Sequence, residues 1–79
     1  MTPDQVTSLL QTSLSDCDIQ VEGEGSHYNI VIVGDCFAGK RAVQRQQLVY
    51  AVLNSAIASG EMHAVNMKLF TRDEWQQRG

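Results

Sequence analysis

The sequence has few cysteines, little positive charge and no long apolar run, and each shortage excludes a class of protein. Its two cysteines, Cys17 and Cys36, are too few for a disulfide framework, and their separation matches no metal-binding spacing. They are expected to be buried or half-buried free thiols. No apolar stretch is long enough to span a bilayer or to act as a secretion signal, so no membrane partner is expected and the cytoplasm is the expected location.

The charge balance and the missing motifs narrow the function further. Six Lys and Arg residues against nine Asp and Glu residues give a net charge of -3, which argues against nucleic acid as the main partner because phosphate binding needs positive charge. The serines lie in no nucleophile elbow, and no glycine-rich phosphate loop precedes a helix. The acidic pairs Asp16/Asp18 and Asp73/Glu74 lie at expected element boundaries. The sequence therefore indicates a protein that is not an enzyme.

What is present suits one small folded domain over residues 1–79. The chain is 43% hydrophobic and carries five aromatic side chains, a composition typical of a folded domain near the lower size limit for a single core. No internal repeat or low-complexity segment interrupts it.

The first half of the sequence predicts a helix and then a β-hairpin. Thr2-Pro3-Asp4-Gln5 is a capping box with proline at the first helical position, and the helix is expected to end at residues 15–16. Residues 18–22 and 28–33 predict two strands joined by a glycine-rich turn over 23–26. The continuous apolar run at the end of the second strand favours a central strand buried on both faces.

The second half predicts a long helix, a strand and a short helix. The helical pattern begins at Lys40 or Arg41 and ends at Gly60, although a break near Val43 or Gln44 would split off a short first helix. Residues 63–70 predict the third strand. A second capping box at 71–74 begins a terminal helix, whose Trp75 is expected to be a core anchor. The apolar stripe of the long helix consists of Val49, Val52, Leu53, Ala56 and Ile57.

This order, α-β-β-α-β-α, predicts an α+β fold with a small three-stranded mixed sheet and helices on one face. Two strands so close in sequence form an antiparallel hairpin, whereas a strand–helix–strand connection is expected to be parallel and right-handed.

The two histidines, His27 and His63, open the second and third strands. If these strands are parallel neighbours, the two positions lie at the same end of the sheet, within about 5–10 Å of each other. Cys17 and Cys36 are expected at the opposite end, roughly 20–30 Å away. Two imidazoles do not complete a zinc site, so the pair suits a site that takes its other ligands from another molecule. Without further information, a histidine is more often a surface or hydrogen-bonded residue.

Four segments in this order resemble the BolA-like family: residues 21–28 (VEGEGSHY), 33–40 (VGDCFAGK), 45–50 (RQQLVY) and 62–71 (MHAVNMKLFT), the last followed by Glu74-Trp75. The short hairpin turn is most similar to that of the bacterial subgroup called IbaG. The resemblance covers nearly the whole chain. It implies a fold like the class II KH domain, which agrees with the element order.

The resemblance also implies a function, that of a non-enzymatic adaptor in iron–sulfur trafficking or in iron and acid-stress regulation. Such proteins bind a monothiol glutaredoxin and share a [2Fe-2S] cluster with it and with glutathione. The family supplies a histidine ligand at the start of the third strand, here His63, and His27 is a candidate second ligand. Thiolates of glutaredoxin and glutathione would complete the site. No cofactor is expected on the isolated chain, which would be a monomer or a weak homodimer.

Two other functions stay open. The KH-like fold hosts nucleic-acid binding and some BolA-like proteins are described as regulators, so Lys40, Arg41 and Arg45 are candidate DNA or RNA contacts. However, Gly34 and Gly39 do not match the GXXG clamp of KH domains, and such charges are commonly a solvated helix face. A stress-related interaction module with both histidines unliganded is the third alternative.

Overall fold

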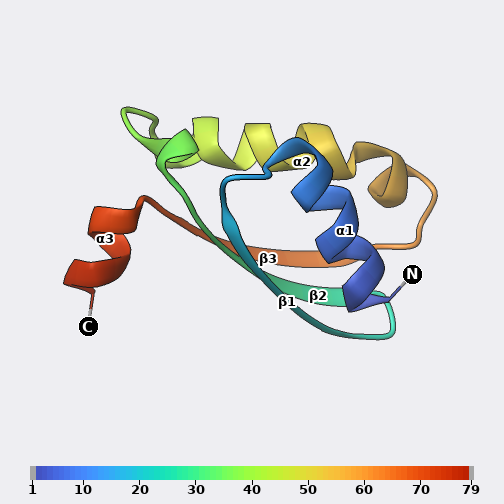
Figure 1. Cartoon of the computed structure of the whole chain (residues 1–79). Helices are drawn as coiled ribbons and strands as arrows, with labels where there is room; N and C mark the ends of the chain where they lie inside the picture. The colour runs from blue at the N-terminus through green and yellow to red at the C-terminus, as the bar shows by residue number, and fades with distance from the viewer. Residues whose placement is uncertain (1, 79) are drawn as a thin grey trace.

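The computed structural model describes residues 2–78, in which three α-helices accompany a three-stranded sheet (Figure 1). The sheet order is β1-β2-β3, with β1 antiparallel to β2 and β2 parallel to β3. The predicted α+β element order and the mixed sheet are therefore confirmed. The elements are α1 (Pro3–Ser13), β1 (Asp18–Glu24), β2 (His27–Val33), the 3-10 helix η1 (Asp35–Phe37), α2 (Ala42–Ala58), β3 (Ala64–Phe70) and α3 (Arg72–Gln77).

Local hydrogen bonds define the helix starts as the sequence predicts. In α1 the Thr2 hydroxyl accepts from the Gln5 backbone N–H at 3.2 Å, while the Gln5 side chain accepts from the Thr2 N–H at 2.9 Å. Thr71 and Glu74 form the same reciprocal pair at the start of α3. Such boxes satisfy the free N–H groups of a first helical turn.

Several predicted boundaries differ from the structure. Helix α1 ends at Ser13, before residues 15–16, and α2 begins at Ala42 and continues without a break through Val43 and Gln44. A separate short helix, η1, precedes it instead. The hairpin turn is reduced to Gly25-Ser26 because β1 extends to Glu24.

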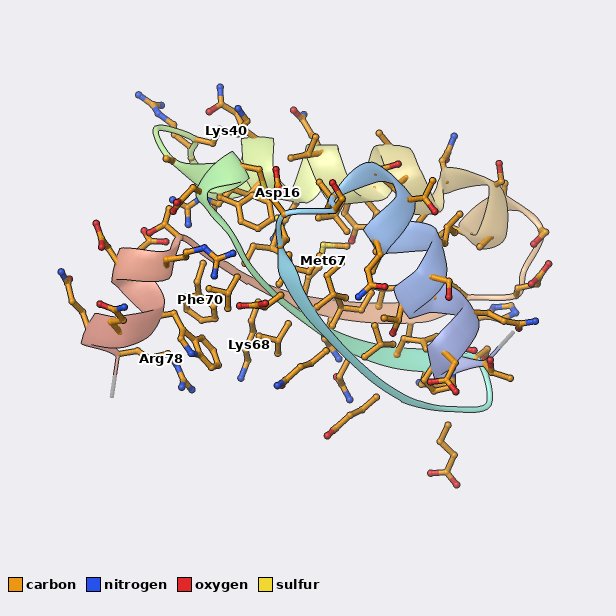
Figure 2. The ribbon with its side chains drawn as sticks, in the orientation of Figure 1. Asp16, Lys40, Met67, Lys68, Phe70 and Arg78 are labelled. Atoms are coloured by element: carbon orange, nitrogen blue, oxygen red, sulfur yellow. The ribbon has the colours of Figure 1, made fainter. Side chains whose placement is uncertain are left out.

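The core lies between one face of the sheet and the two longer helices. Figure 1 shows α1 and α2 on the same side of the sheet. Alternate residues of β2 point into this core, and Figure 2 shows the same alternation in β3, where Met67 points toward the helices and Lys68 away from them. The fully buried side chains include Val6, Leu10, Tyr28, Ile30, Ile32, Phe37, Val49, Leu53 and Met62.

Burial corrects two of the expectations from sequence. Strand β2 is central, but its second face is only partly buried, because Val33 is buried and Val31 half-buried while His27 and Asn29 are exposed. Trp75 is not a core anchor. It is half-buried and packs edge-to-face on Phe70, with the ring centroids 5.5 Å apart.

The position of α3 explains why Trp75 stays outside the core. Thr71 alone separates α3 from β3, so this short helix stands beyond the end of the sheet (Figure 1). None of its residues is buried. Across residues 2–78, no helix combines the length and the apolar character that crossing a membrane requires.

Candidate functional site

His63 does not open the third strand as predicted, because β3 begins at Ala64. It lies one residue earlier, in the connection between α2 and β3, on a backbone that is held in place. Gly60, just past the helix, has φ of 84° and turns the chain back toward the sheet. Met62 is fully buried, and the His63 N–H donates to the Ser26 carbonyl at 2.9 Å. The same carbonyl accepts from the Ala64 N–H at 3.2 Å. The His63 side chain is exposed, so a fixed backbone presents an accessible imidazole.

Gly60 also borders the imidazole itself. A Cβ at this position would lie 3.7 Å from His63 Nε2, which places the ring beside the C-terminal end of α2. A larger side chain at residue 60 would cover part of the imidazole. Neither Gly60 nor the Ser26 carbonyl was identified as part of the site from the sequence, because both contacts depend on how two connections fold against each other.

His27 is the first residue of β2 and pairs with Ala64 in the parallel ladder. The structure thus confirms that the two histidines share one end of the sheet. Their rings leave it in different directions. Tyr28 is buried under the helices, so His27 projects from the open face, whereas the His63 ring lies beside α2.

The described part of the chain does not form a complete metal centre by itself. Within residues 2–78, no three His, Cys, Asp or Glu side chains are arranged to hold a metal ion. A metal centre at His63 would need ligands from another molecule.

The predicted basic patch is partly occupied by an internal ion pair. Lys40 and Arg41 are exposed, but Arg45 is half-buried. Its guanidinium donates to both carboxylate oxygens of Glu74, at 2.6 and 3.2 Å, and to the carbonyls of Lys40 and Leu69. Hydrogen bonds from Arg45, followed by the Thr71 backbone N–H, lower the pKa of Glu74 from 4.5 to about 2. The positive charge of Arg45 is therefore already paired with Glu74 inside the molecule.

The cysteines lie at the other end of the sheet from the histidines, as predicted, and they touch. Cys17 is buried and Cys36 half-buried, and their Sγ atoms are 3.0 Å apart. Burial, together with the hydrogen bond to Cys36, raises the pKa of Cys17 from 9.0 to about 12. The sequence predicts free thiols at one end but not their contact, which depends on the conformation of two irregular connections.

Known proteins are similar to this chain in sequence and in fold. The sequence profile of the family described as BolA-like protein matches residues 5–74. The "Uncharacterized protein in rpoN-murA intergenic region" of Acinetobacter guillouiae is 44% identical over 77 residues, covering 98% of this chain and 93% of its own length. The Acid stress protein IbaG of Escherichia coli K12 is 39% identical over 75 residues, covering 95% and 89%. A solved bolA protein homologue from Coxiella burnetii superposes with a TM-score of 0.84 at 32% identity, covering 96% and 97%.

Proposed function

The chain belongs to the BolA-like family, and we propose that it is a non-enzymatic cytoplasmic adaptor that binds a monothiol glutaredoxin and shares a [2Fe-2S] cluster with it. The observation that carries this proposal is the exposed imidazole of His63 on a backbone tied to Ser26 and anchored by buried Met62. A fixed ligand of this kind loses little conformational freedom when a partner docks.

The chemistry of an imidazole fits one position of a shared cluster. Histidine replaces cysteine on one iron of some two-iron clusters. Thiolates of the glutaredoxin and of glutathione supply the remaining ligands. His63 is the ligand from this chain, and its place at the end of the sheet lets a partner approach it from solvent.

His27 has a secondary place in this proposal. It lies at the same end of the sheet, yet its side chain leaves from the open face while the His63 ring lies beside α2. A partner seated over the end of α2 reaches His63 first. His27 is therefore a candidate contact whose removal weakens the complex less than removal of His63.

The test is to mix the protein with a monothiol glutaredoxin that carries a cluster and to follow visible circular dichroism. The wild-type chain should change the spectrum, and His63→Ala should not. His27→Ala is the matched control, because it removes the same side chain one strand away, and it should keep most of the change. Both histidines are exposed, so neither variant should alter far-UV circular dichroism. An unchanged wild-type spectrum, or an equal response from His63→Ala, rejects the proposal.

Nucleic-acid binding is the less favoured function. A phosphate approaching Lys40 and Arg45 would meet the Glu74 carboxylate, which lines the same surface hollow and already holds Arg45. Binding through these residues should weaken steeply with salt, and Lys40→Gln with Arg41→Gln should flatten that dependence.

Because the Escherichia coli relative is named an acid stress protein, acid stress is the condition in which we expect the adaptor to act.

A further inference from the structure

We propose that Cys17 and Cys36 are a redox-active thiol pair, which closes reversibly into an intramolecular disulfide by exchange with a low-molecular-weight disulfide. The observation that carries this inference is the 3.0 Å contact between the two Sγ atoms, one buried and one half-buried. The pair lies at the opposite end of the sheet from His63, so this inference is independent of the proposed function.

The hairpin brings the two thiols together. Cys17 stands in the connection from α1 to β1, and Cys36 stands in η1, just after β2. Asp18 and Val33 are paired in the antiparallel ladder, so the two connections leave the sheet side by side. A disulfide has an S–S length near 2.05 Å, so the sulfur atoms need to approach by about 1 Å.

Gly34 keeps the Cys17 sulfur in position. Its backbone is extended, with φ of -176°, so no unusual dihedral angle requires a glycine there. Space requires it, because a Cβ at this position would overlap Cys17 Sγ. The sulfur of Cys17 therefore lies close to both the Gly34 backbone and the Cys36 sulfur.

The two thiols differ in access, and this difference assigns their roles. Cys36 is half-buried and reaches solvent, so it is the attacking thiol. Cys17 is 8% exposed, and its raised pKa keeps it protonated toward reagents in solution. It is the resolving thiol, which reacts once a mixed disulfide has formed on its neighbour.

The exchange is balanced in two steps. The Cys36 thiolate attacks one sulfur of a disulfide RSSR, which forms a mixed disulfide and releases one RS⁻. Cys17 then gives up its proton, and its sulfur attacks Cys36 Sγ, which releases the second RS⁻. The protein thiols lose two electrons and two protons, and RSSR becomes two RSH. Excess RSH reverses both steps.

The full chain should be equilibrated with mixtures of glutathione disulfide and glutathione and then analysed by mass spectrometry. We expect the intact mass to fall by two hydrogens, both cysteines to be protected from alkylation, and one peptide cross-link to join Cys17 to Cys36. A disulfide that closes the segment between Cys17 and Cys36 into a loop should raise the thermal unfolding midpoint by about 10 °C. Two thiols that remain open to alkylation, or a cross-link between two chains, would overturn the proposal.

Two matched variants test the roles of the thiols. Cys17→Ser lacks the resolving thiol and should accumulate one glutathione adduct on Cys36. Cys36→Ser lacks the attacking thiol and should remain unmodified over the same time. Equal modification of the two variants would contradict the assignment, and a stable glutathione adduct on the wild-type chain would contradict disulfide closure.

Discussion

Individual residues decide how closely the connections approach one another, and glycines show this best. Gly34 has an ordinary extended backbone but no room for a side chain beside Cys17 Sγ. Gly25, in the hairpin turn, is the reverse case. It has φ of 64° and open space around it. One glycine is required by packing and the other by conformation.

Replacing Gly34 with alanine should lower the free energy of unfolding by about 1–3 kcal/mol, because the new methyl group overfills the space held by the Cys17 sulfur. Adding Cys17→Ala should recover part of this loss, so the two changes should be strongly non-additive in urea unfolding.

Gly25→Ala serves as the control for this cycle. Its cost comes from positive φ, so it should be additive with Cys17→Ala. Additive behaviour of the Gly34 pair as well would mean that the sulfur does not fill this space.

The sequence could predict where the candidate ligands lie but not where they point. Strand direction alone places His27 and His63 at one end of the sheet and both cysteines at the other, and the ladder confirms this. The direction of the His63 ring depends on Gly60, and the thiol contact depends on η1. Both are tertiary features of irregular backbone, for which a periodic pattern carries no information.

Among the elements, α3 depends most on polar contacts. None of its residues is buried, and its attachments to the rest of the chain include the Arg45–Glu74 ion pair, the exposed Arg72–Asp18 pair at 3.1 Å and the packing of Trp75 on Phe70. Arg72 also donates to the Asp16 carbonyl at 2.7 Å. Figure 2 shows Phe70 and Arg78 beside this helix. Glu74 also accepts from the Thr71 N–H in the capping box, so one carboxylate supports both the helix start and its attachment to α2.

The ionisation of Glu74 should control how α3 responds to acid. Its folded pKa of about 2 is below the ordinary 4.5, so the stabilisation is complete above about pH 4.5 and is lost as the pH falls through about 2. A carboxyl titration by NMR should show this low midpoint. Arg45→Gln should raise it toward 4.5, because the Arg45 hydrogen bond is the largest cause of the shift, while the Thr71 backbone hydrogen bond remains.

Arg72→Gln provides the control for the titration. It breaks the other ion pair of α3, with Asp18, and should leave the Glu74 midpoint where it is. A wild-type midpoint near 4.5 would contradict the ion pair as described.

The starts of α1 and α3 were predictable because they rest on local hydrogen bonds. Both capping boxes form as their sequences indicate. The apolar run of β2 predicted burial on both faces, and this was wrong because burial of the second face depends on whether a helix covers it. In this molecule α1 and α2 cover one face, and α3, which follows directly after Thr71, stands beyond the end of the sheet.

At the scale of the whole molecule, the sheet separates two sites. Strand β2 runs from His27 to Val33, a span of roughly 20 Å at the usual rise per residue, and its two ends meet different connections. The connection from α2 to β3 lies at the end that carries the histidines. The connections from α1 to β1 and from β2 to η1 lie at the end that carries the cysteines. The core that fills the space between them is a single cluster of buried side chains.

This separation predicts that the two ends behave independently in unfolding experiments. Gly60→Ala at the histidine end forces a side chain onto φ of 84° and should cost about 1–2 kcal/mol. Combined with Gly34→Ala at the cysteine end, its effect should add to within about 0.5 kcal/mol, because the sites are far apart and share no contact. The Gly34→Ala and Cys17→Ala pair, whose two sites are in contact at the cysteine end of the sheet, is the comparison in which non-additive effects are expected. Larger coupling between Gly60 and Gly34 would show that strain at one end of the sheet reaches the other, and oxidation of the cysteines would then be able to alter the site at His63.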